Sequence, residues 1–319
     1  EPAAGCYSAV RPPDEANLRE YDSRNNHTVY LADYELGGEV PEEFILSCIA
    51  AQATPMIILR PPSDKKITVL QLYSFAKWLG RYNLPMFVAI FPVEPDLTLS
   101  ADMYAVYYKH AHTNLNKYAP LAAAVWLADA NKDNSEAYYP GHDKVDWVGF
   151  TCQSGFAKKE PGITEKLEAF YMKYQHDKPV ILGPFGVSHF SDTDFTYYTA
   201  EAADELRRIY AAVRDGFPRV KMIAYADVNL IPSGGHDDFS FSQDDELRQA
   251  YADAAGDAYF SINLDTRSDG SDKYGWLRGG EAGYFIDGQA YIGAKTKSIG
   301  MEALRPDHSK RLFYVYANN

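Results

Sequence analysis

The sequence predicts a (β/α)8 TIM barrel with a small C-terminal antiparallel β appendage. Eight short, nearly continuous apolar runs alternate with amphipathic segments across roughly 230 residues, which matches the arithmetic of this barrel. Continuous apolar runs are typical of parallel strands that are covered on both faces. A doubly wound sheet is the competing architecture, but the first run leads into Arg11, Pro12 and Pro13 and not into a glycine-rich phosphate turn.

The predicted strands are rich in Val, Ile and aromatic residues. They span residues 5–10, 28–33, 55–60, 85–91, 122–127, 145–151, 179–182 and 221–225. Apolar residues at helical spacing predict helices over residues 42–51, 67–82, 102–118, 164–174, 200–214 and 244–255. Ser100 is expected to cap the helix that follows it, and Ser242 with Asp245 resembles a weak capping box.

The pattern changes after about residue 260. Short apolar runs over 259–264, 283–286, 289–292 and 311–316 predict further strands, and Asp287–Gly288 is a strong two-residue hairpin turn. We therefore expect a (β/α)8 barrel over residues 1–262 and a small β extension over 263–319.

The composition excludes several classes of partner. A net charge of −13 disfavours nucleic acid and anionic lipid, and no apolar run is long enough to span a bilayer. The 25 Tyr, 16 Phe and 4 Trp residues offer flat faces that suit neutral sugars. The chain starts at Glu1 and has three cysteines, too few for a disulfide framework. Because the chain starts without a Met, we expect a processed or a trimmed chain.

Polar and aromatic residues follow the ends of the predicted strands, where barrel enzymes place their functional groups. Aromatic faces can stack on sugar rings, and carboxylates and amides can bind hydroxyls. The candidate substrate-binding residues are Tyr34, Glu35, Arg60, Glu94, Trp126, Asp129, Gln153, His189, Asp227 and Asn229. Any one of them could instead be an ordinary loop residue, but together they predict a saccharide cleft.

Several segments resemble glycoside hydrolase family 26, the β-mannanase and lichenase group. They are Gly5-Cys6-Tyr7-Ser8, Tyr138-Tyr139-Pro140-Gly141, 102–116, 145–149, Lys178-Pro179-Val180 with Phe185-Gly186, and 244–260. The resemblance covers most of the predicted barrel. It implies the barrel fold and an ancestry among enzymes that act on β-linked polysaccharides. Together with a start that lacks Met, the resemblance implies an extracellular or cell-surface protein whose signal peptide has been removed.

The catalytic positions of that family are not kept. The resemblance implies a nucleophilic glutamate directly before Phe185-Gly186, where this chain has Pro184. It implies an acid/base glutamate where this chain has Val93, and Glu94 stands one position late. A one-residue shift at a strand end turns a side chain to the other face, although a bulge could return Glu94 to the cleft.

Two hypotheses follow. The first is a degenerate barrel that binds polysaccharide or acts as a cell-surface or scaffolding domain. The alternative is an active hydrolase on a mannan, glucan or xylan, in which Glu94 is the best single catalytic candidate and Glu35 or Asp227 is its partner. A retaining pair would need carboxyl groups about 5–5.5 Å apart.

No cofactor or metal is expected from the sequence. The run Asp129–Asn134 resembles the start of a calcium loop, but it lacks the glycine at its sixth place. Cys152 has no histidine partner that can be named, so a buried, unreactive thiol is the better interpretation.

Overall fold

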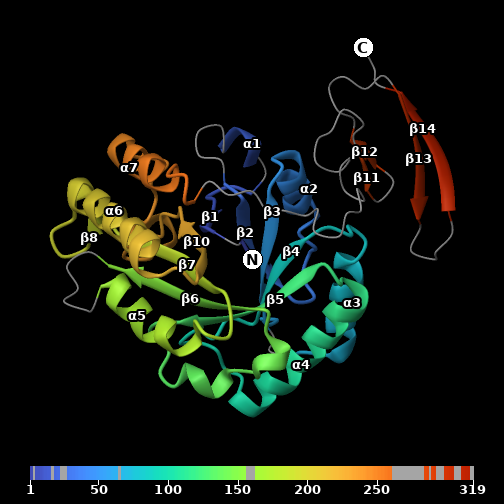
Figure 1. Ribbon diagram of the computed structural model, residues 1–319, viewed down its shortest axis with the longest axis horizontal. Helices are drawn as coiled ribbons and strands as arrows, with labels where there is room; N and C mark the ends of the chain where they lie inside the picture. The colour runs from blue at the N-terminus through green and yellow to red at the C-terminus, as the bar shows by residue number, and fades with distance from the viewer. Residues whose placement is uncertain are drawn as a thin grey trace.

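The computed structural model describes residues 1–2, 4–15, 18–21, 27–63, 66–155 and 162–260, and four strands between 284 and 316. Eight parallel strands form a closed barrel in the order β1-β10-β7-β6-β5-β4-β3-β2. They are β1 (Tyr7–Arg11), β2 (Val29–Glu35), β3 (Thr54–Arg60), β4 (Met86–Ile90), β5 (Ala122–Asp129), β6 (Trp147–Ser154), β7 (Val180–Val187) and β10 (Val220–Ala226). The predicted barrel and its eight strands are confirmed (Figure 1).

Helices surround the ring of strands, as Figure 1 shows. The described helices are α1 (Leu18–Tyr21), α2 (Glu42–Ala50), α3 (Val69–Leu79), α4 (Ala101–Tyr118), α5 (Ile163–Tyr174), α6 (Thr199–Gly216) and α7 (Asp245–Ala255). Short 3-10 turns lie at η1 (Ser135–Tyr138), η2 (His142–Lys144) and η3 (Ile231–Ser233). The six predicted helices are present, and α1 was not predicted. Within the described part of the chain, no helix has both the length and the apolar character to cross a membrane.

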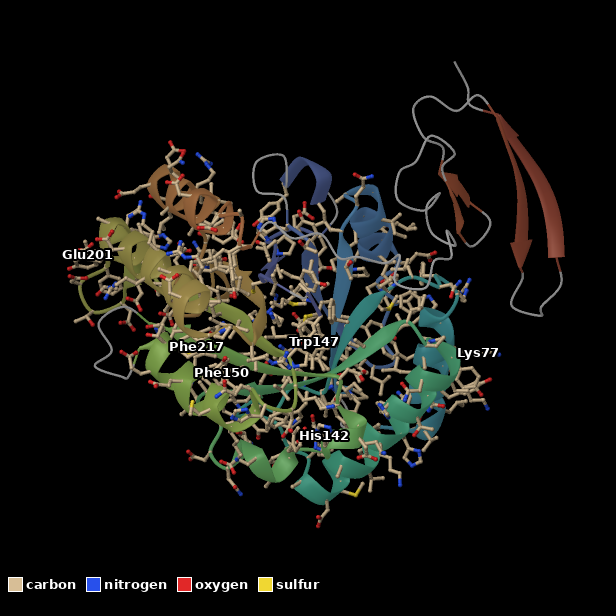
Figure 2. The ribbon with its side chains drawn as sticks, viewed as in Figure 1. Lys77, His142, Trp147, Phe150, Glu201 and Phe217 are labelled. Carbon is tan, nitrogen blue, oxygen red and sulfur yellow. The ribbon has the colours of Figure 1, made fainter. Side chains whose placement is uncertain are left out.

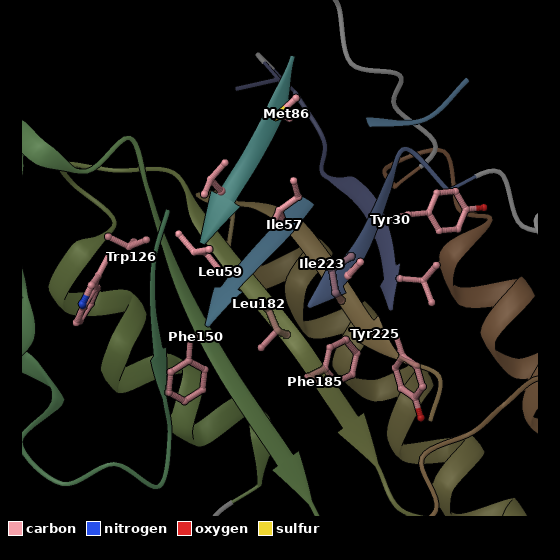
Figure 3. Packing of buried hydrophobic residues seen from close by; sticks show 14 of the residues in the cluster. Tyr30, Ile57, Leu59, Met86, Trp126, Phe150, Leu182, Phe185, Ile223 and Tyr225 are labelled. Atoms are coloured by element: carbon pink, nitrogen blue, oxygen red, sulfur yellow. The ribbon is translucent and has the colours of Figure 1, made fainter. Parts of the chain in front are cut away.

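Two hydrophobic clusters divide the barrel. The inner cluster consists of residues from barrel strands alone, such as Ile58, Leu127 and Trp147. The outer cluster joins the opposite faces of the same strands to the helices and includes Tyr30, Leu59 and Tyr225 (Figure 3). Because side chains alternate along a strand, each strand feeds both clusters. Figure 2 shows Trp147 inside the ring, with Lys77 and Glu201 on the outer helices.

Side-chain caps set where several helices begin. Ser100 caps α4 by accepting a hydrogen bond from the Met103 amide, as predicted. The predicted box at Ser242 and Asp245 is wrong, because Asp244 caps α7 and accepts from the amides of Glu246 and Leu247. A carboxylate one residue ahead of the first helical turn satisfies two free amides by itself.

The C-terminal part contains two small antiparallel sheets. One pairs β11 (Tyr284–Ile286) with β12 (Gln289–Tyr291), and the other pairs β13 (Ser298–Leu304) with β14 (Lys310–Tyr316). The strand predicted over 259–264 begins as a turn at Tyr259 and Phe260, and its remainder lies outside the described residues. The Asp287–Gly288 turn also lies outside them. Strand β13 was not predicted, and neither was the hairpin of β8 (Phe190–Ser191) with β9 (Thr196–Tyr197).

Candidate functional site

A cleft of about 310 Å³ lies at the carboxyl ends of the barrel strands. This volume is at the lower end of the roughly 300–1,000 Å³ range of ligand pockets. Its polar and charged lining residues are Arg11, Arg60, Glu94, Asp96, Asp129, Thr151 and Gln153, and its other lining residues are Ile58, Pro95, Leu127 and Pro184. Of the candidates from the sequence, Arg60, Glu94, Asp129 and Gln153 lie in this cleft.

Strand alternation selects which residues reach the cleft. On β3, Ile58 faces the barrel interior and Arg60 follows it two residues later at the mouth. On β5, Leu127 and Asp129 bear the same relation. Because successive side chains point to opposite faces, the intervening residue on each strand packs against the helices.

Glu94 reaches the cleft through a local irregularity. Residue Phe91, directly after β4, has a φ of 49°, in the left-handed region. Phe91 and Val93 are both buried in the outer cluster, and Val93 pairs with Ala128 of β5. The left-handed residue shifts the alternation by one position, so that Glu94 faces inward where a regular strand would turn it outward. The sequence analysis left open whether a backbone irregularity returns Glu94 to the cleft, and this irregularity does so.

Strand β7 carries a bulge beside the cleft. Its register runs from Phe150↔Leu182 to Cys152↔Phe185, so β7 contains one residue more than its neighbour β6. The bulge consists of Gly183 and Pro184, and the Pro184 ring forms part of the cleft wall. The position that precedes Phe185 therefore presents an unreactive ring to the cleft.

A chain of ion pairs crosses the mouth from β1 to the segment after β4. Arg11 lies 2.5 Å from Asp33 of β2, which also contacts the Arg60 guanidinium. Arg60 also forms a bidentate ion pair with Glu94, in which Nη1 donates to Oε2 and Nη2 donates to Oε1 at 3.0 Å. Burial lowers the pKa of Arg60, but the contacts with Glu94 and Asp33 outweigh it and raise the pKa overall. Arg60 therefore stays charged, and both Glu94 oxygens act as acceptors.

Asp129 is fixed at the same mouth by different partners. Its carboxylate accepts hydrogen bonds from the Thr151 hydroxyl at 3.0 Å and from the Asn131 amide at 2.7 Å. These are neutral donors, so the negative charge of Asp129 is not cancelled by an adjacent cation in these contacts. Asp129 can accept further hydrogen bonds from hydroxyls in the cleft.

The two predicted aromatic candidates do not reach the cleft. Tyr34 is buried in the outer cluster, with its ring stacked 5.1 Å from Phe75 of α3. Trp126 is fully buried and contacts Tyr139 and other rings outside the barrel. Both occupy outward positions of their strands, so the structure corrects their placement.

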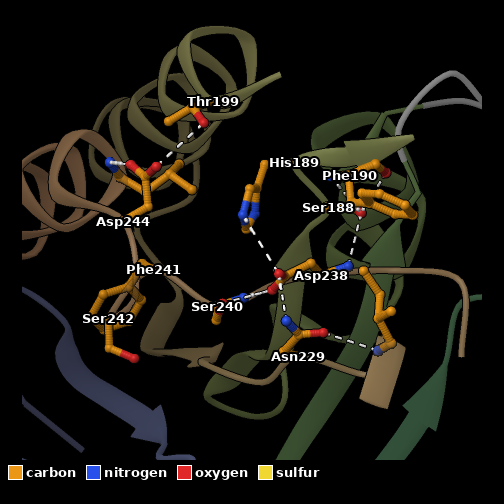
Figure 4. Close-up of polar contacts among 12 residues, drawn as sticks. Ser188, His189, Phe190, Thr199, Asn229, Asp238, Ser240, Phe241, Ser242 and Asp244 are labelled. Carbon is orange, nitrogen blue, oxygen red and sulfur yellow. Dashed lines mark hydrogen bonds and ion pairs between the residues drawn. The ribbon is translucent and has the colours of Figure 1, made fainter. Parts of the chain in front are cut away.

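Glu35 lies at the surface and accepts from the Ser63 amide at 2.9 Å, outside the cleft lining. The remaining three candidates, His189, Asp227 and Asn229, hold the loop between β10 and α7. Asn229 donates to Asp238 at 2.7 Å, and His189 Nε2 lies 3.7 Å from the same carboxylate (Figure 4). Asp227 is fully buried and accepts from Tyr21 and from the amides of Phe241 and Ser242. Neither Glu35 nor Asp227 lines the cleft with Glu94.

The prediction missed Arg11, Asp33, Asp96 and Thr151. Arg11, Asp33 and Thr151 lie at inward-facing positions near the ends of their strands, so counting by two from a buried residue would have found them. Asp96 follows an irregular segment and has no such signal. Among the described residues, no group of three His, Cys, Asp or Glu side chains could hold a metal ion.

No family model matches the chain, and no curated protein matches it in sequence. Its barrel is similar to those of solved glycoside hydrolases. The endo-1,4-beta-xylanase XylE of Penicillium canescens matches with a TM-score of 0.59 and 11% identity over 79% of this chain and 94% of the xylanase. GH26A of Muricauda sp. MAR_2010_75 matches with a TM-score of 0.53 and 13% identity over 82% of this chain and 93% of that protein.

A GH113 β-1,4-mannanase also matches, with a TM-score of 0.53 and 10% identity over 79% of this chain and 98% of the mannanase. At these identities the likeness shows the fold. This likeness agrees with the expected glycoside-hydrolase-26-like barrel. It does not extend to the chemistry of the cleft, which depends on the residues that line it.

Proposed function

We propose that the barrel binds a neutral β-linked polysaccharide in its cleft and does not hydrolyse it. The observation that carries this proposal is the state of the two catalytic positions. Pro184 offers no nucleophilic atom, and the Arg60 guanidinium occupies both oxygens of Glu94. A hydrolytic acid must donate a proton to the leaving oxygen, and Glu94 in this pair acts only as an acceptor.

The cleft retains groups that suit sugar hydroxyls. Asp129, Gln153 and Thr151 offer acceptors and donors at the mouth, within a wall that includes Ile58 and Leu127. A few directional polar groups on a partly apolar surface are typical of small-ligand sites. Arg11 and Arg60 are already paired with carboxylates, so the cleft favours a neutral ligand over an acidic one.

The proposal extends to the whole chain. Residues 1–262 would be the binding barrel and 263–319 a β extension, in an extracellular or cell-surface protein that presents the barrel to glycans. The likeness of the barrel to a xylanase and a β-1,4-mannanase supports a role in contact with polymeric glycans.

Affinity electrophoresis in gels that contain soluble mannan, glucan or xylan tests the proposal, together with an assay for reducing ends in the same mixtures. We expect slower migration in at least one gel and no release of reducing ends. Release of reducing ends by the purified wild-type chain would contradict the proposal.

An active hydrolase is the second candidate, because Glu94 and Asp129 both face the cleft. In this alternative we propose Asp129, in place of Glu35 or Asp227, as the partner of Glu94, because Asp129 lines the cleft with it. If turnover is found, Glu94→Gln and Asp129→Asn should each abolish it, whereas Glu35→Gln should leave it unchanged.

A further inference from the structure

The β8–β9 hairpin places aromatic side chains in solvent. Phe195, in the loop between the two strands, is 78% exposed, the largest exposure of any large hydrophobic side chain in the described part of the chain. Tyr197 is 53% exposed. Phe190 lies between them, with ring centroids 5.1 Å from Tyr197 and 6.4 Å from Phe195. We refer to Phe190, Phe195 and Tyr197 as the hairpin cluster.

Folding does not explain Phe195. Its φ is 56°, a left-handed conformation that costs a bulky residue about 1–3 kcal/mol and that Gly or Asn adopts easily. Its exposed ring also buries little area that could offset this cost. A residue that is unfavourable both in its backbone conformation and in its exposure is expected where a ligand uses it.

Hydrogen bonds fix the backbone of the hairpin before any ligand arrives. Asp194 accepts hydrogen bonds from the Tyr198 hydroxyl at 2.5 Å and from the Thr196 amide at 3.3 Å. The Tyr198 amide donates to the His189 carbonyl at 2.7 Å, which closes the base of the hairpin. A backbone that is already fixed loses little conformational entropy when the side chains on it bind a ligand.

The chemistry around the hairpin cluster fits a neutral sugar. Asp192 and Asp194 are exposed carboxylates of the same hairpin, Asp192 lies 3.5 Å from His236 Nδ1, and the segment 189–198 contains no Lys or Arg. Together with a net charge of −13, this disfavours nucleic acid and acidic lipid. Aromatic faces flanked by carboxylates can contact the C–H face of a pyranose and accept from its hydroxyls.

The hairpin is continuous with the cleft. It follows β7, whose Pro184 forms part of the cleft wall, so it leaves the barrel at the same end. The Ser188 amide donates to the Ser154 carbonyl, next to Gln153 of the cleft. A cleft of about 310 Å³ contacts only a short stretch of a polymer, so a longer chain must extend over the surrounding surface.

We propose that the hairpin cluster is a second saccharide-binding surface, which contacts the part of a neutral polysaccharide that extends beyond the cleft. This inference rests on the proposed function of the cleft. It predicts that the hairpin cluster strengthens the binding of polymers and does not affect that of short oligosaccharides.

The test measures the binding of a soluble β-1,4-mannan, glucan or xylan and of its trisaccharide to the full chain by isothermal titration calorimetry. The variants are Phe195→Ala, Phe195→Asn and Tyr197→Ala, with Leu70→Ala on α3 as control, because Leu70 is 70% exposed on the opposite side of the barrel. Each hairpin variant should weaken polymer binding roughly tenfold and leave trisaccharide binding unchanged. The Leu70→Ala variant should bind both ligands as tightly as wild type. Phe195→Asn should also melt at the same temperature as wild type or higher, since it relieves the backbone conformation.

Three results would overturn the inference. If polymer binding survives both Phe195→Ala and Tyr197→Ala while the trisaccharide still binds, the cleft binds alone and the proposed function stands. If the variants change only the self-association of the chain in size-exclusion chromatography, the hairpin cluster is a protein interface. If wild type binds neither the polymer nor the trisaccharide, the inference and the proposed function fail together.

Discussion

Arg60 links two carboxylates at the mouth of the barrel, Asp33 of β2 and Glu94 after β4. Its planar guanidinium contacts Asp33 and Glu94 at once, which a lysine ammonium cannot match because it is a single point charge. Arg60→Lys should therefore lower the free energy of unfolding by about 1 kcal/mol and weaken glycan binding. Denaturant unfolding and affinity electrophoresis measure the two effects. The matched control is Arg207→Lys, which changes an exposed pair with Asp204 and should be neutral. Equal effects of both variants would contradict this role.

Asp227 has a structural role. Burial and the Asp227 charge raise the pKa of Tyr21, so the tyrosine keeps its proton and donates to Asp227 at 2.7 Å. Asp227→Ala leaves that hydroxyl and two amides without their acceptor, and should cost at least about 2 kcal/mol of stability. Thermal and denaturant unfolding measure this. Asp253 is an exposed carboxylate on α7, so Asp253→Ala should change stability little. An equally small loss of stability in Asp227→Ala would contradict the structural role of Asp227.

At the scale of elements, the β7 bulge shapes the cleft wall. Gly183 has a φ of 130°, and a Cβ there would lie 2.1 Å from the Ala224 carbonyl oxygen of β10. Gly183→Ala should therefore destabilise the barrel by roughly 3 kcal/mol or more. Gly216→Ala at the end of α6 is the control, because nothing lies within 4 Å of its added Cβ. Unfolding midpoints of the two variants should differ clearly, and similar values would argue against the strained bulge.

Helix α4 contributes a pH dependence. Burial lowers the pKa of His112 below its ordinary value of 6.5, and its Nε2 lies 3.2 Å from the Asn116 amide nitrogen. The folded chain therefore binds fewer protons at this site than the unfolded chain, so acidification through 6.5 lowers stability. His112→Gln should lose less stability than wild type between about pH 7 and about pH 5, as measured by denaturant midpoints. A larger loss in the variant would reverse the sign and contradict this.

The elements also show what the sequence could predict. Continuous apolar runs located all eight barrel strands, because each is buried on both faces. The same property hides which side chains face inward, so Tyr34 and Trp126 were assigned to the cleft although they pack outside the barrel. The irregularities at Phe91 and Gly183 depend on contacts with neighbouring strands, and they decide how Glu94 and Pro184 reach the cleft. No periodic pattern in the sequence predicts that the Phe195 side chain is exposed.

At the scale of the whole molecule, the net charge of −13 disfavours anionic ligands and leaves the binding of neutral ones unaffected. Binding of a neutral glycan involves no release of counterions, so its dissociation constant should change little between about 0.05 and about 0.5 M salt. Calorimetric titrations across this range provide the measurement. A steep loss of affinity with salt would indicate an ionic ligand and a different use of Arg11 and Arg60.

The most direct test follows the anomeric proton signals of a β-1,4-linked oligosaccharide by NMR in the presence of the purified chain. If the cleft binds without hydrolysis, the signals of the oligosaccharide broaden or shift, and no signal from a newly formed reducing end grows with time. New reducing-end signals would show that the cleft still cleaves glycosidic bonds, and unchanged spectra across β-linked mannan, glucan and xylan oligosaccharides would show that it does not hold them.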